Sequence, residues 1–235
     1  MDNWVGMEFD PEALERIRRS CDMLGCQNGM TVLDIGCYRQ TAKKFLPPCS
    51  YHGFDIGKFS DGIIVRDLEN GFLWDKRVDR ILCLEVLEHL KTPSRVLRSI
   101  QEYLKDDGIA IISLPNEASA FHRLRSLLGT VDAEAFSEAG KHLHLPSLKQ
   151  ASAFVSKYLE ILKVECYIST GNGTRQLFLS KILKRIPKQF LKLLSVLSPS
   201  LFSRGFIFKV RKKVLPLPHR VPWVTESGTN YAHRS

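Results

Sequence analysis

The sequence lacks a long apolar run, a patterned set of cysteines and a leader-like N-terminus. No segment reaches the about 18 consecutive apolar residues of a membrane-spanning helix, so none is expected. The N-terminus has neither a basic start nor an apolar stretch, which argues against a secretory signal peptide. Six scattered cysteines form no matching pair of CxxC motifs, which argues against a zinc site and a disulfide framework. These absences predict a reduced, cytoplasmic protein.

Acidic residues are almost missing from the C-terminal part of the chain. Residues 171–235 carry 13 Lys and Arg but a single Asp or Glu, whereas residues 1–170 carry 21 against 24. The net charge of +9 over 235 residues therefore belongs to a basic appendage on a nearly neutral body. We expect one domain over 1–213, with a basic amphipathic insertion at about 172–203. A flexible tail, rich in Pro, His and small polar residues, is expected over 214–235.

Short apolar segments alternate with helical ones along the body. Asp10, Pro11 and Glu12 form a good helix start, which predicts a first helix as far as Leu24. Strands are predicted at 31–35, 51–55, 62–66, 79–84, 108–113, 161–169 and 206–211. Further helices are predicted at about 39–46, 93–105, 117–128 and 147–159. Nearly continuous apolar strands between helices indicate a parallel sheet covered on both faces.

Acidic residues stand at the carboxyl ends of the first four predicted strands. In an open parallel sheet, ligands bind beyond these ends, near the point where the strand order reverses. The four strand ends carry, in order, Asp34, Asp55, Asp67 and Glu85. Asp55 follows Gly36 by 19 residues, which is where an acceptor for ribose hydroxyls is expected. Four such acids at one edge predict a binding site.

Six motifs resemble those of the class I S-adenosylmethionine-dependent methyltransferases. They are VLDIGC (32–37), HGFDI (52–56), RDLENG (66–71), CLEVLEHLKTP (83–93), ISLPN (112–116) and HLHLPSLKQASAFV (142–155). EVLEH together with SLPN is similar to the bacterial branch that modifies quinones, glycans and lipid-linked intermediates. The resemblance covers about residues 28–170. It implies an α/β fold, a doubly wound Rossmann-like sheet of seven strands with the last one inserted antiparallel. Helices would cover both faces, with an N-terminal helix and a basic helical insertion before the last strand.

The resemblance also implies S-adenosylmethionine as the cofactor. The implied cofactor-binding residues lie in or just after the first four strands: Asp34, Gly36, Cys37, Tyr38, Asp55, Ile56, Asp67, Leu68, Leu84 and Glu85. Gly36 would admit the methionine moiety, and Asp55 would accept both ribose hydroxyls with Ile56 on the adenine. Asp67 would accept from the adenine amino group with Leu68 beside the ring.

The acidic positions each have a simpler structural explanation, and two further residues are candidates for contact with the methionine moiety. Leu84 and Glu85, after the fourth strand, would line that side of the cofactor. Asp34 with Gly36 could instead be a simple turn, and Asp55 a solvated strand end. Asp67 precedes residues that favour turns by themselves.

The loop after the first strand departs from the family pattern. Its usual second and third glycines are replaced by Tyr38 and Gln40. Glycine is needed only where φ is positive or a backbone must come very close. The Tyr38 side chain could therefore hinder the cofactor's carboxylate end, or the loop could hold it at negative φ with its ring turned outward. Arg39 could pair with that carboxylate or lie on the surface.

The catalytic candidates are histidines. The cofactor's sulfonium already activates the methyl group, so the protein has to align the acceptor and remove a proton from a hydroxyl. His89 is the first candidate base, since it shares a predicted helix face with Glu85 and Glu88. It could equally cap or pack its helix, and this face could hold a divalent metal, although the sequence leads us to expect none. His142 and His144, before the helix at 147–159, are the second candidates.

The segment 175–197 reads as a basic amphipathic helix broken by a proline. It fits contact with an anionic membrane surface at the inner face of the membrane, or a lid that packs on the body. Nucleic acid is a weaker partner because no stacking motif accompanies the charge. The sequence predicts a methyltransferase that acts on a small-molecule, glycan or lipid-linked acceptor, with a hydroxyl as the expected group. The rival is an inactive methyltransferase-like binding or scaffold protein, for which Tyr38 and Gln40 argue.

Overall fold

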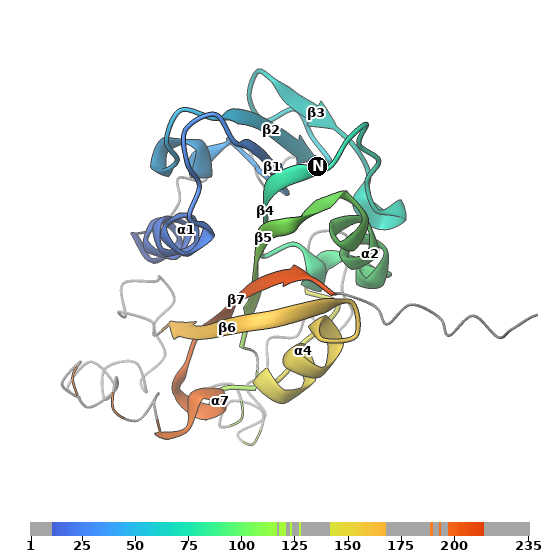
Figure 1. Ribbon diagram of the computed structural model, residues 1–235. Helices are drawn as coiled ribbons and strands as arrows, with labels where there is room; N and C mark the ends of the chain where they lie inside the picture. Colours follow the sequence, from blue (N-terminus) through green and yellow to red (C-terminus); the bar gives the residue numbers. More distant parts are fainter. Residues whose placement is uncertain are drawn as a thin grey trace, which may run out of the picture.

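A seven-stranded mixed sheet forms the centre of the protein (Figure 1). The computed structural model describes residues 11–116, 118–120, 142–167 and 197–213, with single positions 123, 127, 189 and 193. The strands are β1 (Thr31–Ile35), β2 (Ser50–Asp55), β3 (Ile63–Val65), β4 (Val78–Leu84), β5 (Leu104–Pro115), β6 (Leu159–Tyr167) and β7 (Gly205–Lys212). Each predicted strand is present, so the α/β fold with seven strands is confirmed.

The strand order is β3-β2-β1-β4-β5-β7-β6, and the first five of these strands are parallel to one another. β7 lies antiparallel between β5 and β6, which confirms the expected inserted last strand. The order reverses between β1 and β4, so ligands are expected where the carboxyl ends of these two strands part. The ends of β6 and β7 at Tyr167 and Gly205 are opposite each other at the same edge.

Helices cover both faces of the sheet, as expected. On one face α1 (Pro11–Leu24) and the 3₁₀ helix η2 (Thr41–Phe45) enclose a core that includes Val32, Leu82 and Ile111. On the other face α2 (Pro93–Tyr103) and α4 (Leu148–Val155) enclose the core around Leu33 and Ile81 (Figure 1). Neighbouring residues of one strand thus belong to different cores, as the alternation of side chains requires.

The remaining elements are short. They are the 3₁₀ helices η3 (Leu68–Asn70) and η4 (Leu87–His89), and the helix α7 (Pro199–Phe202). The helix expected at 39–46 is only the 3₁₀ turn η2, and the one expected at 147–159 ends at Val155. The predicted helix at 117–128, the basic insertion at 172–203 and the tail at 214–235 lie wholly or mostly outside the described residues. In the described part of the chain, no helix combines the length and hydropathy that crossing a membrane requires.

The start of β5 differs from the expectation. A turn was expected over Asp106–Gly108, but the strand already begins at Leu104, which pairs with Val78. The register shifts between Val78 and Arg80, so the extra residues form an irregularity in the strand. Lys105 within it lies 2.6 Å from a carboxylate oxygen of Asp79, an ion pair between strands that the local sequence does not reveal.

Candidate active site at the carboxyl edge of the sheet

The loop after β1 begins with a glycine that no other residue can replace without strain. Gly36 has φ of 73°, and a Cβ atom there would collide with Cγ2 of Val86 at the end of β4. The backbone N–H groups of Gly36 and Cys37 both donate to the carbonyl of Phe54, at 2.9 and 3.0 Å. The Cys37 side chain is buried, so this residue contributes backbone rather than its thiol to the loop. The loop is therefore bound tightly to the end of β2.

The two residues that replace loop glycines keep a glycine-like backbone. Tyr38 has φ of 47° and Gln40 has φ of 55°, both in the left-handed region. The expectation that Tyr38 could sit at negative φ is therefore wrong. The Gln40 side chain donates to the hydroxyl of Ser60 and to the carbonyl of Asp61, at 3.1 and 2.6 Å. These bonds hold the strained turn against the loop that follows β2, so the loop keeps its shape without the glycines.

The Tyr38 ring packs against other side chains of the same region. Its centroid lies 5.1 Å from that of Phe59, and the Arg39 guanidinium lies 5.4 Å from the ring. Phe59 itself comes close because Gly57 has no side chain to obstruct it. The Tyr38 ring therefore leans toward the loop after β2, and Arg39 stacks on it.

Asp55 joins the loops after β1 and β2. One carboxylate oxygen accepts from the backbone N–H of Tyr38 and the other from that of Ile56, each at 2.7 Å. Partial burial raises the pKa of Asp55, and the backbone N–H groups oppose this shift. A carboxylate has about four lone-pair positions, so acceptor capacity remains for a ligand. Ile56 beside it is 61% exposed and offers an apolar surface.

Asp34 lies beneath the loop and does not face a ligand. Its carboxylate is 3% exposed and accepts a short hydrogen bond from the Tyr51 hydroxyl. Burial raises the pKa of Asp34 to about 7, opposed by the bond from Tyr51, with the nearby charge of Asp55 adding to the rise. Asp34 thus supports the loop from the core, and the expectation that it helps to bind the cofactor stays a prediction.

The third strand end is only partly as expected. Asp67 is exposed, and its Oδ1 accepts from the backbone N–H of Glu69 at 2.9 Å, so it caps η3. This is the turn chemistry that was the plainer alternative, and a role toward an adenine stays a prediction. Leu68 is buried in the core beneath α2 at 6% exposure. A place for Leu68 beside the adenine ring therefore stays a prediction, although most of its side chain belongs to the core.

The end of β4 carries a charged network that includes an arginine missed by sequence reasoning. Glu85, with φ of 56°, has one carboxylate oxygen 3.6 Å from a guanidinium nitrogen of Arg16. Its other oxygen accepts from the Ser113 hydroxyl at 3.0 Å. The Arg16 guanidinium also lies 5.9 Å from the Tyr167 ring, and its Nε is buried without a partner among the described residues. Leu84 is half-buried and packs toward the core below α1. A largely buried cation thus stands at the expected methionine side.

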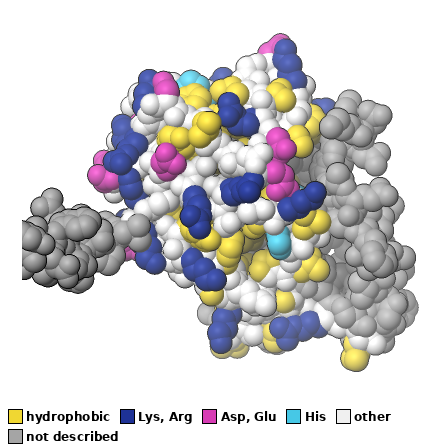
Figure 2. Space-filling model, turned by 90° about the vertical axis from the view of Figure 1, so that its right-hand side faces the viewer, with side chains coloured by type: hydrophobic (Ala, Val, Ile, Leu, Met, Phe, Trp, Pro, Cys, Tyr) yellow, Lys and Arg dark blue, Asp and Glu magenta, His cyan; other side chains and the backbone are white. Residues whose placement is uncertain are grey.

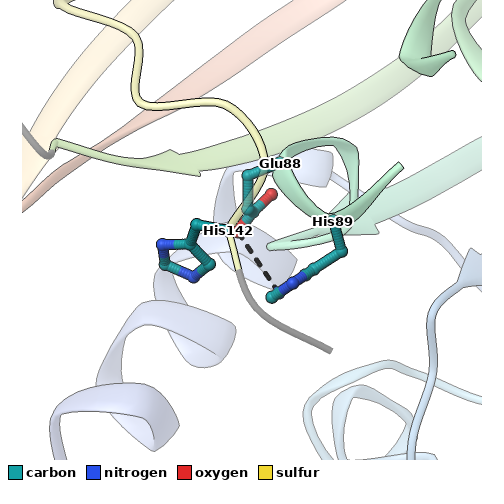
Figure 3. A group of neighbouring side chains, drawn as sticks. All are labelled: Glu88, His89 and His142. Atoms are coloured by element: carbon teal, nitrogen blue, oxygen red, sulfur yellow. Dashed lines mark ion pairs between the residues drawn. The ribbon is translucent and has the colours of Figure 1, made fainter. Parts of the chain in front are cut away.

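Three more candidate residues meet next to this network (Figure 3). Glu88 and His89 come from η4, and His142 comes from the segment before α4. His89 Nε2 lies 4.0 Å from Glu88 Oε1, and the ring centroids of His89 and His142 are 4.9 Å apart. The Glu88 side chain is fully buried. Two of the three predicted catalytic histidines are therefore brought together, around a carboxylate.

His144 is separated from this pair by its hydrogen bond. Its Nε2 lies 2.9 Å from the backbone carbonyl of Leu90, and the residue lines a cavity of about 370 Å³ next to α4. Leu143, Leu145 and Phe154 line the same cavity, which is mainly apolar. The structure therefore gives His144 a contact with the backbone, and its role in catalysis stays a prediction. Figure 2 shows one face of the molecule, on which basic side chains are spread among apolar ones.

These features fit S-adenosylmethionine. The glycine at 36 leaves room that a Cβ would fill, and two further positions keep a left-handed backbone. A partly buried carboxylate, an exposed isoleucine and a buried guanidinium follow around the edge, and they match a ribose, a purine and an amino-acid carboxylate.

Comparisons with known proteins agree with the geometry. The ubiquinone biosynthesis O-methyltransferase of Rickettsia bellii (strain OSU 85-389) is 36% identical over 70 residues, which are 30% of this chain and 26% of that protein. N-methyltransferase 4 of Papaver somniferum is 25% identical over 138 residues, 49% of this chain and 39% of that protein. The matches thus span well under half the length of these curated relatives.

A solved structure and a family model complete the comparison. The N-methyltransferase NodS of Bradyrhizobium japonicum WM9, in complex with S-adenosyl-L-homocysteine, superposes with a TM-score of 0.56 at 13% identity, over 91% of this chain and 94% of that one. It shares the fold. A family model described as a methyltransferase domain matches residues 9–156, more than half of the chain. The chain therefore belongs to the methyltransferase-domain family, with the class I fold and S-adenosylmethionine as the cofactor.

Proposed function

We propose that this chain transfers a methyl group from S-adenosylmethionine to a hydroxyl of a small-molecule or lipid-linked acceptor. The observation that carries the proposal is the preserved loop after β1. Its left-handed turns at Tyr38 and Gln40 and the bond from Tyr38 to Asp55 keep the cofactor loop in shape although its glycines are missing. This speaks against an inactive binding protein, whose main support was the loss of those glycines.

Different residues at the carboxyl edge of the sheet would bind different parts of the cofactor. S-adenosylmethionine supplies a methyl group that its sulfonium already activates. Asp55 would accept from the ribose hydroxyls with its remaining lone pairs, and Ile56 would cover the adenine. Arg16 would pair with the amino-acid carboxylate, since its guanidinium is buried next to Glu85 and its Nε has no partner within the described part of the chain. Gly36 would let that end of the ligand approach the backbone.

The acceptor is expected beside the His89 and His142 rings, because η4 directly follows the methionine side of the edge at Glu85. An imidazole can take up the proton that a hydroxyl must lose. The match to an O-methyltransferase supports an oxygen acceptor, whereas the match to an N-methyltransferase, at lower identity over a longer stretch, supports an amine. Methylation of hydroxyl and amine compounds of otherwise equal structure separates the two.

A lipid-linked acceptor accords with the place of the basic segment in the chain. β6 ends at Tyr167 and β7 begins at Gly205, opposite each other at the candidate edge, and the backbone N–H of Arg204 donates to the Tyr167 carbonyl at 2.8 Å. The segment between them therefore leaves and rejoins the sheet near the site. We propose that 175–197 contacts an anionic membrane surface, so that the protein is peripheral at the inner face of the membrane.

Calorimetric titration with S-adenosylhomocysteine tests the cofactor site. Asp55→Ala should weaken binding tenfold or more, because charged hydrogen bonds contribute about 1.5–3 kcal/mol each. It should also lower thermal stability, since two backbone N–H groups lose their acceptor. Asp106→Ala is the matched control, because its carboxylate is 82% exposed and its partners within the described part of the chain are the cations of Arg77 and Lys212. Failure of the unmodified chain to bind, or equal affinity in the Asp55 and Asp106 variants, would contradict the proposal.

A further inference from the structure

Glu88, His89 and His142 have the geometry of a metal-binding site. Their ligand atoms all lie within 4.8 Å of one another, and Glu88 Oε1 and His89 Nε2 are 4.0 Å apart. Figure 3 shows the two η4 side chains and His142 extending toward one common region. Two ligands that each lie about 2.1 Å from an ion can be at most about 4.2 Å apart. Small side-chain rotations are therefore enough to place all three on one ion.

The backbone holds the two contributing segments together at this point. The backbone N–H groups of Leu143 and His144 both donate to the carbonyl of Glu88, at 2.7 and 3.2 Å. The backbone N–H of His89 in turn donates to the carbonyl of Val86 at 3.1 Å. Residues more than 50 positions apart in the sequence are thus fixed next to each other before any ligand binds. Such preorganisation is what a binding site requires.

We propose that Glu88, His89 and His142 bind one divalent first-row transition-metal ion, which in turn binds the oxygen of the methyl acceptor. Two imidazoles with one carboxylate suit Mn²⁺, Fe²⁺, Co²⁺ or Zn²⁺ better than Mg²⁺ or Ca²⁺, which prefer oxygen ligands. The sequence had led us to expect no metal, because it could not show His142 beside η4.

The role in acceptor binding rests on the proposed function. Three protein ligands leave positions open on the ion. A hydroxyl oxygen bound in one of them has a lowered pKa and releases its proton to solvent water before methylation. With the ion bound, His89 is a ligand, and the role of base that the proposed function gives to it passes to solvent water. The acceptor class is accordingly one whose hydroxyl can itself coordinate a metal, such as a phenol or a diol.

Metal binding can be measured without cofactor or acceptor. The full chain, freed of metals with a chelator that is then removed, is titrated with MnCl₂ while the free Mn²⁺ is followed by electron paramagnetic resonance, and with CoCl₂ by visible absorption. One ion per chain is expected. His89→Gln and His142→Gln should each weaken binding tenfold or more. His144→Gln, two residues away in the same segment, is the matched control and should change it less than threefold.

Several results would overturn the metal site. The first is that the unmodified chain binds neither Mn²⁺ nor Co²⁺. The second is that the His142→Gln and His144→Gln variants bind the metal equally well, whether both keep the affinity of the unmodified chain or both lose it to the same extent. Should His89→Gln fail to fold, the comparison of His142 with His144 decides alone, because both residues lie in the partly exposed segment before α4. Titration of the same metal-free protein with S-adenosylhomocysteine reports separately on the cofactor site. Loss of that binding with metal binding intact would remove the proposed function and leave the metal site standing.

Discussion

Replacing Tyr38 by glycine and by alanine separates the cost of its backbone from the value of its ring. Both variants lose the ring contacts with Phe59 and Arg39, which contribute about 0.5–1.5 and about 0.5–1 kcal/mol. Only glycine also relieves the left-handed backbone at φ of 47°, which costs other residues about 1–2 kcal/mol. The glycine variant should therefore be more stable than the alanine variant by about 1–2 kcal/mol. Relative to the unmodified chain, its stability should change little.

Urea unfolding followed by circular dichroism measures these differences. The control is the same pair of substitutions at Arg19, an exposed position inside α1, where glycine should be about 1 kcal/mol less stable than alanine. The order of the two variants is thus expected to invert between the loop and the helix. Tyr38→Gly should also bind S-adenosylhomocysteine with equal or higher affinity. An alanine variant as stable as the glycine variant would refute the left-handed loop, and loss of binding would make the ring itself a ligand contact.

Three further predictions concern the buried Asp34, the buried Arg16 and the basic segment 175–197. The folded chain keeps a proton on Asp34 between about pH 4 and 7 that the unfolded chain has lost, so the free energy of unfolding should fall with rising pH, by at most about 4 kcal/mol. Asp34→Asn should remove this slope in urea unfolding at several pH values, and an unchanged slope would contradict the raised pKa. Arg16→Gln should weaken S-adenosylhomocysteine at least tenfold but leave methylthioadenosine, which has no carboxylate, unaffected; equal losses would disprove the pairing. The chain should bind anionic vesicles more strongly than neutral ones, and this binding should weaken in high salt and after Gln replaces Lys and Arg within 175–197. If the chain does not bind anionic vesicles even at low salt, the segment is a lid.

The sequence predicts the sheet well because its strands are nearly continuous apolar runs. The ends of β1 at Thr31 and Ile35 are as expected, since both faces of this strand are buried and no register ambiguity arises. The start of β5 could not be predicted, because Leu104 joins the strand by pairing with Val78 of β4, a contact that the local sequence does not reveal. Local patterns thus locate strands, and contacts between strands decide where they begin.

The sequence predicts a site residue well when that residue lies at the end of a recognisable strand. Asp55 lies at the expected strand end, but His142 and His144 are equivalent in the sequence. Only the fold decides which of the two faces His89. The sequence indicates a site role for Arg16 only weakly, by its place next to the apolar positions of the first helix. Without the place of α1 relative to β4, it cannot be told from a surface arginine. Leu68 is buried in the core beneath α2, which the local sequence does not reveal.

The adjacency of Tyr167 and Gly205 has a consequence for how this protein can vary. The two residues face each other across β6 and β7, and a side chain at 205 would collide with the Tyr167 ring, so this junction is closed tightly. When the ends of a connection are already held together, each doubling of its length costs only about 0.6 kcal/mol of closure entropy. The segment between Tyr167 and Gly205 can therefore be replaced, in evolution or by design, with one of another length or charge while the sheet stays intact. Acceptor choice could then evolve separately from the cofactor loop.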